Sequence, residues 1–206
     1  MFRSSGGEPM AAPATTARAL PDRLLEVATR LFAKQGFERT SVAQIVETAG
    51  VTKGALYHYF DSKDDLLHEI YARVLRMQRH RLEEIATGAG GPAERLHAAA
   101  SDVVVTSIAN LDDTTIFQRS MHQLNPEKQR EFRAQRRAYH ERFREIVREG
   151  QEAGLFRADA PTDLTVHFFF GSVHHLGTWY RPDGPLSAAD VGNQFADLLL
   201  AGLRPA

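Results

Sequence analysis

The side chains with the most suggestive chemistry stand together in one short stretch. Lys53 carries an ammonium group that can neutralise a phosphate, and Tyr57 and His58 can reach phosphates or base edges. Gly54 has no side chain, so the backbone there can approach a duplex closely. A helix capped by Thr52 adds free N–H groups and a partial positive charge at its start. This set predicts contacts with the phosphate backbone and the major groove of DNA.

Two short helices and a tight turn are needed to hold these side chains in place. The first helix is expected from Ser41 to about Thr48, and the second ends near Phe60. Gly50 can adopt the left-handed conformation that ends a helix, and Val51 can fill the angle between the two helices. The apolar residues that can share one small core are Leu31, Phe32, Ile45, Val46, Val51, Leu56 and Phe60. The pattern is that of a helix-turn-helix.

Further residues on both sides of the turn follow in a specific order. They are Leu31-Phe32, Gly36-Phe37, Thr40-Ser41, the run from Gly50 to Phe60, and Ser62-Lys63. In this order they resemble the TetR/AcrR family of bacterial transcriptional regulators over about residues 20–70. The resemblance implies a dimeric regulator, usually a repressor, that binds palindromic operator DNA and releases it when a small ligand enters the C-terminal helical domain.

The resemblance also implies which side chains meet DNA. Thr40 and Ser41 would touch phosphates, and Lys63 would approach the DNA from the start of the next helix. Ala43 is a departure, because some family members carry a base-contacting arginine there, and Gln44 becomes the candidate instead. The predicted DNA-contacting residues are Thr40, Ser41, Gln44, Thr52, Lys53, Gly54, Tyr57, His58 and Lys63.

Composition limits the class of protein. The chain has 206 residues, of which 43% are hydrophobic and 25% charged, and it has no cysteine. This profile is typical of a globular protein of one or two domains, excludes disulfides and cysteine-ligated zinc, and is compatible with a reducing cytoplasm. The N-terminal residues lack the apolar core of a secretory signal, Met10 is an alternative start, and no apolar run has transmembrane length. We therefore expect a cytoplasmic protein without membrane contact.

The formal net charge of −1 argues mildly against a nucleic-acid partner. Its distribution matters more than its sum, because many of the basic side chains lie in the first third of the chain. Among the basic residues there are Arg18, Arg23, Arg30, Lys34, Arg39, Lys53 and Lys63. The adjacent pair Arg136-Arg137 is interpreted as a solvated helix face rather than a second DNA patch.

Hydrophobic spacing predicts helices almost throughout, so the fold is expected to be all-α with about nine helices. Residues 1–19 are rich in Gly, Ala, Pro, Ser and Thr and are interpreted as a flexible arm. Residues 20–65 form the predicted three-helix DNA-binding domain. Residues 66–206 form a larger ligand-binding and dimerisation domain, entered through a long helix that opens at Ser62.

A helix expected over residues 162–181, with Thr162 as N-cap, has two distinct faces. Val166, Phe169, Phe170, Val173 and Tyr180 lie on one face, and the other carries His167, Phe168, Gly171, His174, His175 and Thr178. A helix without charge on either face is expected to be buried from two sides. By the family resemblance, it and the helix over 188–203 form the interface of a homodimer, and earlier helices enclose the ligand.

The expected effector is a small molecule of hydrophobic or acyl-CoA-like character. This rests on a resemblance of the segment Trp179–Leu186, with Gly154–Arg157, to actinobacterial regulators of lipid and sterol breakdown in the same family. Such regulators respond to hydrophobic acids or their CoA thioesters. The predicted ligand-binding residues are Val74, Gln78, Phe117, Met121, His174, His175 and Thr178.

Other interpretations remain open at this level. The pair His174-His175 can serve a metal, a ligand or ordinary packing, although helical metal ligands usually stand four residues apart. An enzyme is disfavoured, because no nucleophile elbow, P-loop or zinc-protease motif occurs and no strand precedes Gly88-Ala89-Gly90. No cofactor or metal is expected. A constitutive DNA-binding regulator without an effector is the main alternative. A solid core in the C-terminal domain would favour it, whereas a chamber of roughly several hundred Å³ would favour a ligand-responsive regulator.

Overall fold

A computed structural model describes residues 19–205, except for the side chains of Phe117 and Gln118. The described residues form α-helices joined by turns, with no strand among them, which confirms the all-α prediction. The predicted arm over residues 1–19 lies outside the described residues except for Ala19. The helices are α1 Leu20–Gln35, α2 Val42–Ala49, α3 Lys53–Tyr57, α4 Lys63–Thr87, α5 Pro92–Ala109, α6 Leu111–Ser120, a 3-10 turn η1 Met121–Gln123, α7 Pro126–Glu152, α8 Thr162–His174, α9 Leu176–Trp179 and α10 Ala188–Leu203.

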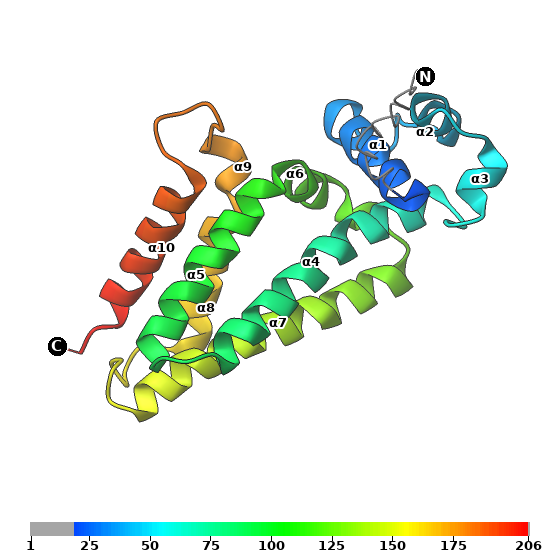
Figure 1. Cartoon of the computed structure of the whole chain (residues 1–206). Coiled ribbons are helices and arrows are strands. Elements are labelled where there is room, and N and C mark those ends of the chain that lie inside the picture. Colours follow the sequence, from blue (N-terminus) through cyan, green and yellow to red (C-terminus); the bar gives the residue numbers. More distant parts are fainter. Residues whose placement is uncertain (1–18, 206) are drawn as a thin grey trace, which may run out of the picture.

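The helices divide into a small bundle and a larger one (Figure 1). Helices α1, α2 and α3 gather at one end, and α4 runs from them into the larger bundle, where it packs against α5 and α7. Helix α10 lies along α5 at the opposite end, beside the C-terminus. Helix α6 contacts α1 as well as α4. The small bundle therefore meets the larger one mainly through α4 and α6.

Local signals explain the helix-turn-helix. The Ser41 hydroxyl oxygen accepts a hydrogen bond from the backbone N–H of Gln44, and Gln44 Oε1 accepts one from the backbone N–H of Ser41, which completes a capping box. Gly50 ends α2 with φ 65° and ψ 39°, a left-handed conformation that suits glycine. Thr52 then caps α3 by accepting from the Ala55 amide. Together with the buried side chains of Ile45, Val46, Leu56 and Phe60, these caps fix the angle between α2 and α3.

The predicted helix over 162–181 is wrong as one continuous element. Helix α8 ends at His174, and α9 resumes at Leu176 and ends at Trp179. Thr162 is the first helical residue rather than the N-cap, and its hydroxyl donates to Gln151 Oε1 at 3.0 Å. One residue, His175, interrupts the helix, and α9 beyond it lies against α6.

Close packing of α10 on α5 depends on a small residue. A methyl group added at Gly192 would come within 2.8 Å of Ser101 Oγ and 2.9 Å of the Ser101 carbonyl oxygen. These distances are shorter than van der Waals contact, so the two helices need glycine at their crossing. No helix within the described residues is long and apolar enough to cross a membrane.

Candidate DNA interface and effector cavity

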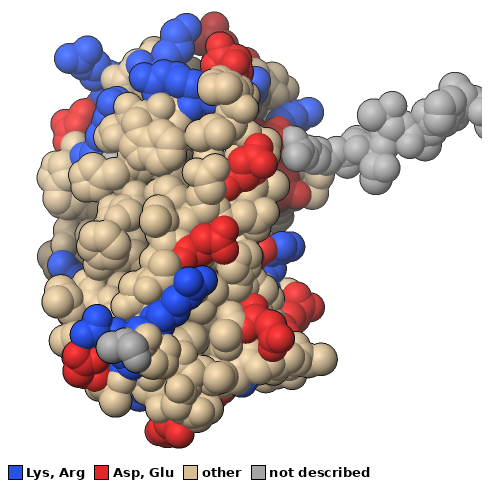
Figure 2. Space-filling model, turned by 90° about the vertical axis from the view of Figure 1, so that its left-hand side faces the viewer, with Lys and Arg blue, Asp and Glu red and all other residues tan. Residues whose placement is uncertain are grey.

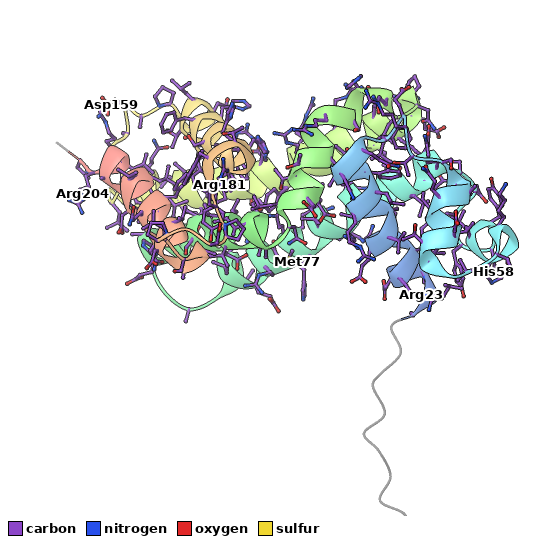
Figure 3. All side chains as sticks on the ribbon, turned by 90° about the horizontal axis from the view of Figure 1, so that it is seen from above. Arg23, His58, Met77, Asp159, Arg181 and Arg204 are labelled. Carbon is purple, nitrogen blue, oxygen red and sulfur yellow. The ribbon has the colours of Figure 1, made fainter. Side chains whose placement is uncertain are left out.

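The polar face of α3 is exposed, as the predicted DNA contact requires. Solvent reaches all four predicted contacts on this face, Lys53, Gly54, Tyr57 and His58, and Tyr57 is 50% exposed. Leu56 on the opposite face is fully buried and anchors the helix to the small bundle. His58 lies at the tip of the molecule remote from the larger bundle (Figure 3). The helix can therefore enter a groove without interference from the rest of the chain.

Ser41 and Gln44 are also exposed, and the capping box engages Ser41 Oγ and Gln44 Oε1. Gln44 Oε1 accepts from the Ser41 amide at 2.9 Å and from Gln35 Nε2 at 3.4 Å. Thr52 is exposed and likewise engaged as the cap of α3, with its Oγ1 3.2 Å from the Ala55 amide nitrogen. These three side chains lie beside the α3 face and orient it. Direct contact of any of them with DNA remains a prediction.

Thr40 and Lys63, two of the predicted DNA contacts, are engaged within the protein, and a phosphate contact by Lys63 remains a prediction. The Thr40 side chain is buried, with 1% of the residue exposed, and its hydroxyl donates to the Gly36 carbonyl at 2.8 Å. Lys63 Nζ donates to the carbonyls of Phe37 and Thr40, at 2.9 and 3.0 Å, and lies 4.2 Å from the centre of the Phe37 ring. A phosphate contact by the Thr40 hydroxyl is therefore not available in this conformation. The two residues fasten the α1–α2 turn to the start of α4.

A cavity of about 90 Å³ lies inside the larger bundle, between α4, α5, α6, α7 and α8. It is lined by Tyr71, Val74, Leu75, Gln78, Val103, Ser107, Asp113, Thr114, Phe132, Arg136, Tyr139, His140, Phe170, Val173 and His174. Of the predicted ligand-binding residues, the structure brings together Val74, Gln78 and His174. The Phe117 side chain is outside the described residues.

The other predicted ligand-binding residues do not line this cavity. Met121 is half-buried in η1, and His175 and Thr178 are exposed. Successive residues on a helix point about 100° apart, so His174 and His175 cannot face the same space. His174 turns inward, whereas His175 borders a surface hollow with Phe168 and Trp179. The sequence assigned both histidines to one face of the helix, and the structure separates them.

Several polar lining residues were missed at the sequence level. Arg136 was interpreted as part of a solvated face, but it is half-buried and its Nη2 lies 3.2 Å from both ring nitrogens of His174. Only its neighbour Arg137 is exposed. His140 is buried and stacks on Phe170 with 4.0 Å between ring centres. Burial lowers the pKa of His140 to about 3 and that of His174 to about 4, with Arg136 acting in the same direction, so both rings are neutral at pH 7.

One chain of contacts connects the cavity with the small bundle. Asp113 on α6 lines the cavity, and its Oδ1 accepts from Arg73 Nη2 of α4 at 3.0 Å. The same Arg73 nitrogen lies 3.4 Å from the Thr29 hydroxyl on α1. Burial raises the pKa of Asp113 above its ordinary value, and Arg73 opposes that rise. A change in the shape of the cavity at Asp113 can therefore reach α1 through a single guanidinium.

A second surface, away from the α3 tip, is apolar. Leu164 and Phe168 on α8 are 65% and 73% exposed, and Leu198 on α10 is 73% exposed. Trp179 is 45% exposed and stacks on Phe195 of α10 with 6.3 Å between ring centres. Figure 2 shows this side of the molecule, where much of the left half carries no charged side chain. Side chains of this size and kind are usually covered by a partner.

Known protein families match both the small bundle and the larger bundle of this chain. The family described as bacterial regulatory proteins, tetR family, matches residues 24–70. The family described as tetracyclin repressor-like, C-terminal domain, matches residues 89–203, more than half of the chain. The chain belongs to the TetR family. This confirms the resemblance seen in the sequence and makes its α1–α3 bundle a helix-turn-helix DNA-binding unit of that family.

Individual TetR-family relatives cover most of the chain. The HTH-type transcriptional repressor KstR2 of Mycolicibacterium smegmatis is 30% identical over 187 residues, which is 88% of this chain and 89% of the relative. The structure of the ketosteroid transcriptional regulator KstR2 of Mycobacterium tuberculosis is 28% identical, with a TM-score of 0.82, and the match covers 92% of this chain and 97% of that one.

A third relative was solved with ligands. The structure of AibR in complex with isovaleryl coenzyme A and operator DNA is 26% identical, with a TM-score of 0.74, and the match covers 90% of this chain and 98% of that one. These similar proteins are transcriptional regulators rather than enzymes. No group of three or more His, Cys, Asp or Glu side chains in the described part of this chain is arranged to hold a metal ion.

Proposed function

We propose that this TetR-family protein is a repressor that binds a palindromic operator as a homodimer and dissociates from it when a small effector enters the larger bundle. The observation that carries the proposal is the exposed face of α3, where Lys53, Gly54, Tyr57 and His58 are open to solvent on a rigidly capped helix. Lysine and tyrosine would fix the register on phosphates, and His58 would approach base edges. Residues 20–65 act as the DNA-binding domain and residues 66–206 as the regulatory one.

The proposed dimer uses the apolar surface of α8, α9 and α10. Leu164, Phe168 and Leu198 offer large exposed side chains, and a second copy related by a two-fold axis would cover them with the same surface. Such a dimer presents two α3 helices related by a two-fold axis, so its operator should have two-fold symmetry. The cytoplasm is the proposed location, because the DNA is there.

The proposed effector is hydrophobic or acyl-CoA-like and would bind in the cavity beside α4. A cavity of about 90 Å³ holds only a small group, so a larger effector would have to separate the helices around it. Movement of α6 or α4 would then reach α1 through Arg73, Asp113 and Thr29. The presence of isovaleryl coenzyme A and operator DNA in the AibR structure supports this mode of regulation for a similar protein.

The constitutive regulator without an effector is the second candidate. The small volume of the cavity favours it, since a chamber of roughly several hundred Å³ is the usual size for a ligand site. The two candidates differ in linkage. If an effector weakens operator binding by about 5–150-fold, operator DNA must weaken effector binding by the same factor.

Linkage can be measured directly once a bound duplex is known. Acyl-CoAs and steroid-like acids are first screened for release of a fluorescent operator duplex, and the strongest compound is then titrated calorimetrically with and without saturating duplex. We expect the two titrations to differ by the factor seen in the release assay. Equal affinities in both titrations, or no release by any compound, would favour the constitutive regulator. The variant Lys53→Ala should weaken operator binding and keep effector binding, which separates the two sites.

A further inference from the structure

The side chain of Gln44 on α2 presents hydrogen-bond donors to solvent and no free acceptor. Its Oε1 accepts from the backbone N–H of Ser41 at 2.9 Å and from Gln35 Nε2 at 3.4 Å. An amide oxygen has two lone pairs, so these two bonds fill it. The bond from Ser41 also fixes the orientation of the amide, because only the oxygen can accept from an N–H. Gln44 is exposed, and its Nε2 has no acceptor among the described residues, so both of its N–H groups are open to a partner outside the chain.

This arrangement limits what Gln44 can recognise on DNA. Glutamine reads adenine with both ends of its amide, since the oxygen accepts from N6 and the nitrogen donates to N7. The filled oxygen of Gln44 leaves only the donating half of that pair. In a helix-turn-helix the first of the two helices crosses the DNA backbone, and the second enters the major groove. Gln44 belongs to the first of these helices, so a phosphate oxygen is the acceptor that its position favours.

We propose that Gln44 Nε2 donates to one phosphate of the operator backbone in each half-site, and that this contact adds affinity without reading sequence. The inference rests on the proposed operator binding and replaces the base contact expected from the sequence with a phosphate contact. A glutamate at this position would complete the same capping box and would suit the start of a helix, but its charge would repel the phosphate. Glutamine keeps the cap and adds the donor.

Two substitutions separate the cap from the contact. Gln44→Glu keeps an acceptor for the Ser41 N–H, whereas Gln44→Met removes both the acceptor and the donor. The probe is a fluorescent duplex carrying the sequence that the full chain selects from a random library. We expect Gln44→Met to bind it about tenfold or more weakly than wild type, because a hydrogen bond to a charged group is lost in each half-site. Gln44→Glu should bind more weakly still.

Thermal unfolding should rank the same proteins differently. Gln44→Glu should be at least as stable as wild type, because it keeps the cap and places an acid in the first turn, and Gln44→Met should be less stable. The slope of log affinity against log salt concentration should be the same for Gln44→Met and wild type, because a neutral donor releases no counterion. A residue that served only as a cap would leave operator affinity unchanged in Gln44→Glu.

Asn193→Asp is the matched control for the added charge. The Asn193 amide oxygen accepts from the Ser101 hydroxyl at 3.2 Å, and the residue is exposed on α10, at the opposite end of the molecule from α2 (Figure 1). This variant should bind the duplex like wild type. Replacement of single phosphates by neutral methylphosphonates then locates the contact. One replacement in each half-site should weaken binding by wild type and leave binding by Gln44→Met unchanged.

Wild-type affinity in Gln44→Glu would overturn the contact and leave only the cap. A selected sequence that loses its preference at one base pair in Gln44→Met, with no methylphosphonate position that distinguishes the two proteins, would overturn the assignment to phosphate. If Gln44→Met does not fold, Gln44→Glu and the same scan decide. A wild-type protein that binds no duplex would refute operator binding and this contact with it, whereas tight binding by wild type and both variants would refute the contact alone.

Discussion

Removal of Arg73 should weaken both the fold and the connection between the two bundles. Arg73 Nη2 lies 3.0 Å from Asp113 Oδ1, and the two side chains are 30% and 9% exposed. Loss of one partner from a fully buried ion pair costs about 3–5 kcal/mol, whereas an exposed pair contributes about 0–1 kcal/mol. The partial exposure of Arg73 places this pair between those limits. We therefore expect Arg73→Met to lower the free energy of unfolding by roughly 1–3 kcal/mol.

A double-mutant cycle separates the pair from its surroundings. Asp113→Asn keeps the shape of the acceptor but removes its charge, and the double variant Arg73→Met/Asp113→Asn leaves no charge of the pair unmatched. Urea denaturation of the four proteins at pH 7.5 should give a coupling free energy of about 1–2 kcal/mol, with the double variant more stable than the sum of the single losses predicts. Additivity within about 0.3 kcal/mol would refute the assignment of a coupled, partly buried pair.

The pH dependence provides a second readout of the same pair. Burial raises the pKa of Asp113 in the folded state, so the folded protein holds this proton more tightly than the unfolded chain does. Stability from this group therefore falls as pH rises from the ordinary carboxyl pKa through the folded one. Loss of Arg73 raises the folded pKa of Asp113 further, because the opposing charge is gone. The deficit of Arg73→Met should thus be smaller at about pH 5 than at about pH 7.5, and the double variant should not show this trend.

Three further predictions concern the DNA face, the helix packing and the dimer. Lys53→Ala and Tyr57→Ala should each weaken operator binding with unchanged thermal unfolding, and Lys53→Ala should reduce the slope of log affinity against log salt concentration by about one. If either variant binds the operator like the wild-type protein in anisotropy titrations at about 0.15 M salt, α3 is not the contact. Gly192→Ala should cost roughly 1–3 kcal/mol in urea denaturation, whereas Gly202→Ala on the same helix, which meets open space, should be neutral or stabilising; equal effects would contradict the close crossing of α5 and α10. Leu198→Lys should convert a dimer to monomer in sedimentation at micromolar concentration, and a wild-type protein that is monomeric there would remove the basis of the proposed dimer.

The helix-turn-helix could be predicted from the sequence because its signals are local. A capping serine, a glycine in the left-handed conformation and a capping threonine follow within a few residues, and each acts on its own neighbours in the chain. The long helices are equally visible as apolar periodicity. The break after His174 could not be predicted, because Leu176 and Tyr180 continue the apolar spacing across it.

The cavity could not be predicted in the same way, because its lining comes from five helices. Arg136 and Arg137 are chemically alike and adjacent. Arg136 is half-buried and Arg137 is exposed because of the way α7 is rotated about its own axis, and the polar residues on most sides of this 27-residue helix do not reveal that orientation in the sequence. Lys63 presents the same difficulty in another form. Its ammonium group donates to the carbonyl oxygens of residues 37 and 40. The sequence near the DNA-binding motif does not indicate that this lysine binds backbone carbonyls within the protein.

The most direct test of the central claim is selection of bound sequences from a random duplex library with the full chain. We expect enrichment of a palindrome whose half-sites are centred about one helical turn, or a multiple of it, apart, because two α3 helices related by a two-fold axis must reach equivalent grooves. Lys53→Ala, carried through the same selection, should enrich the same palindrome more weakly than the wild-type protein does. Absence of enrichment with the wild-type protein, or a consensus without two-fold symmetry, would contradict the account of a dimeric operator-binding regulator.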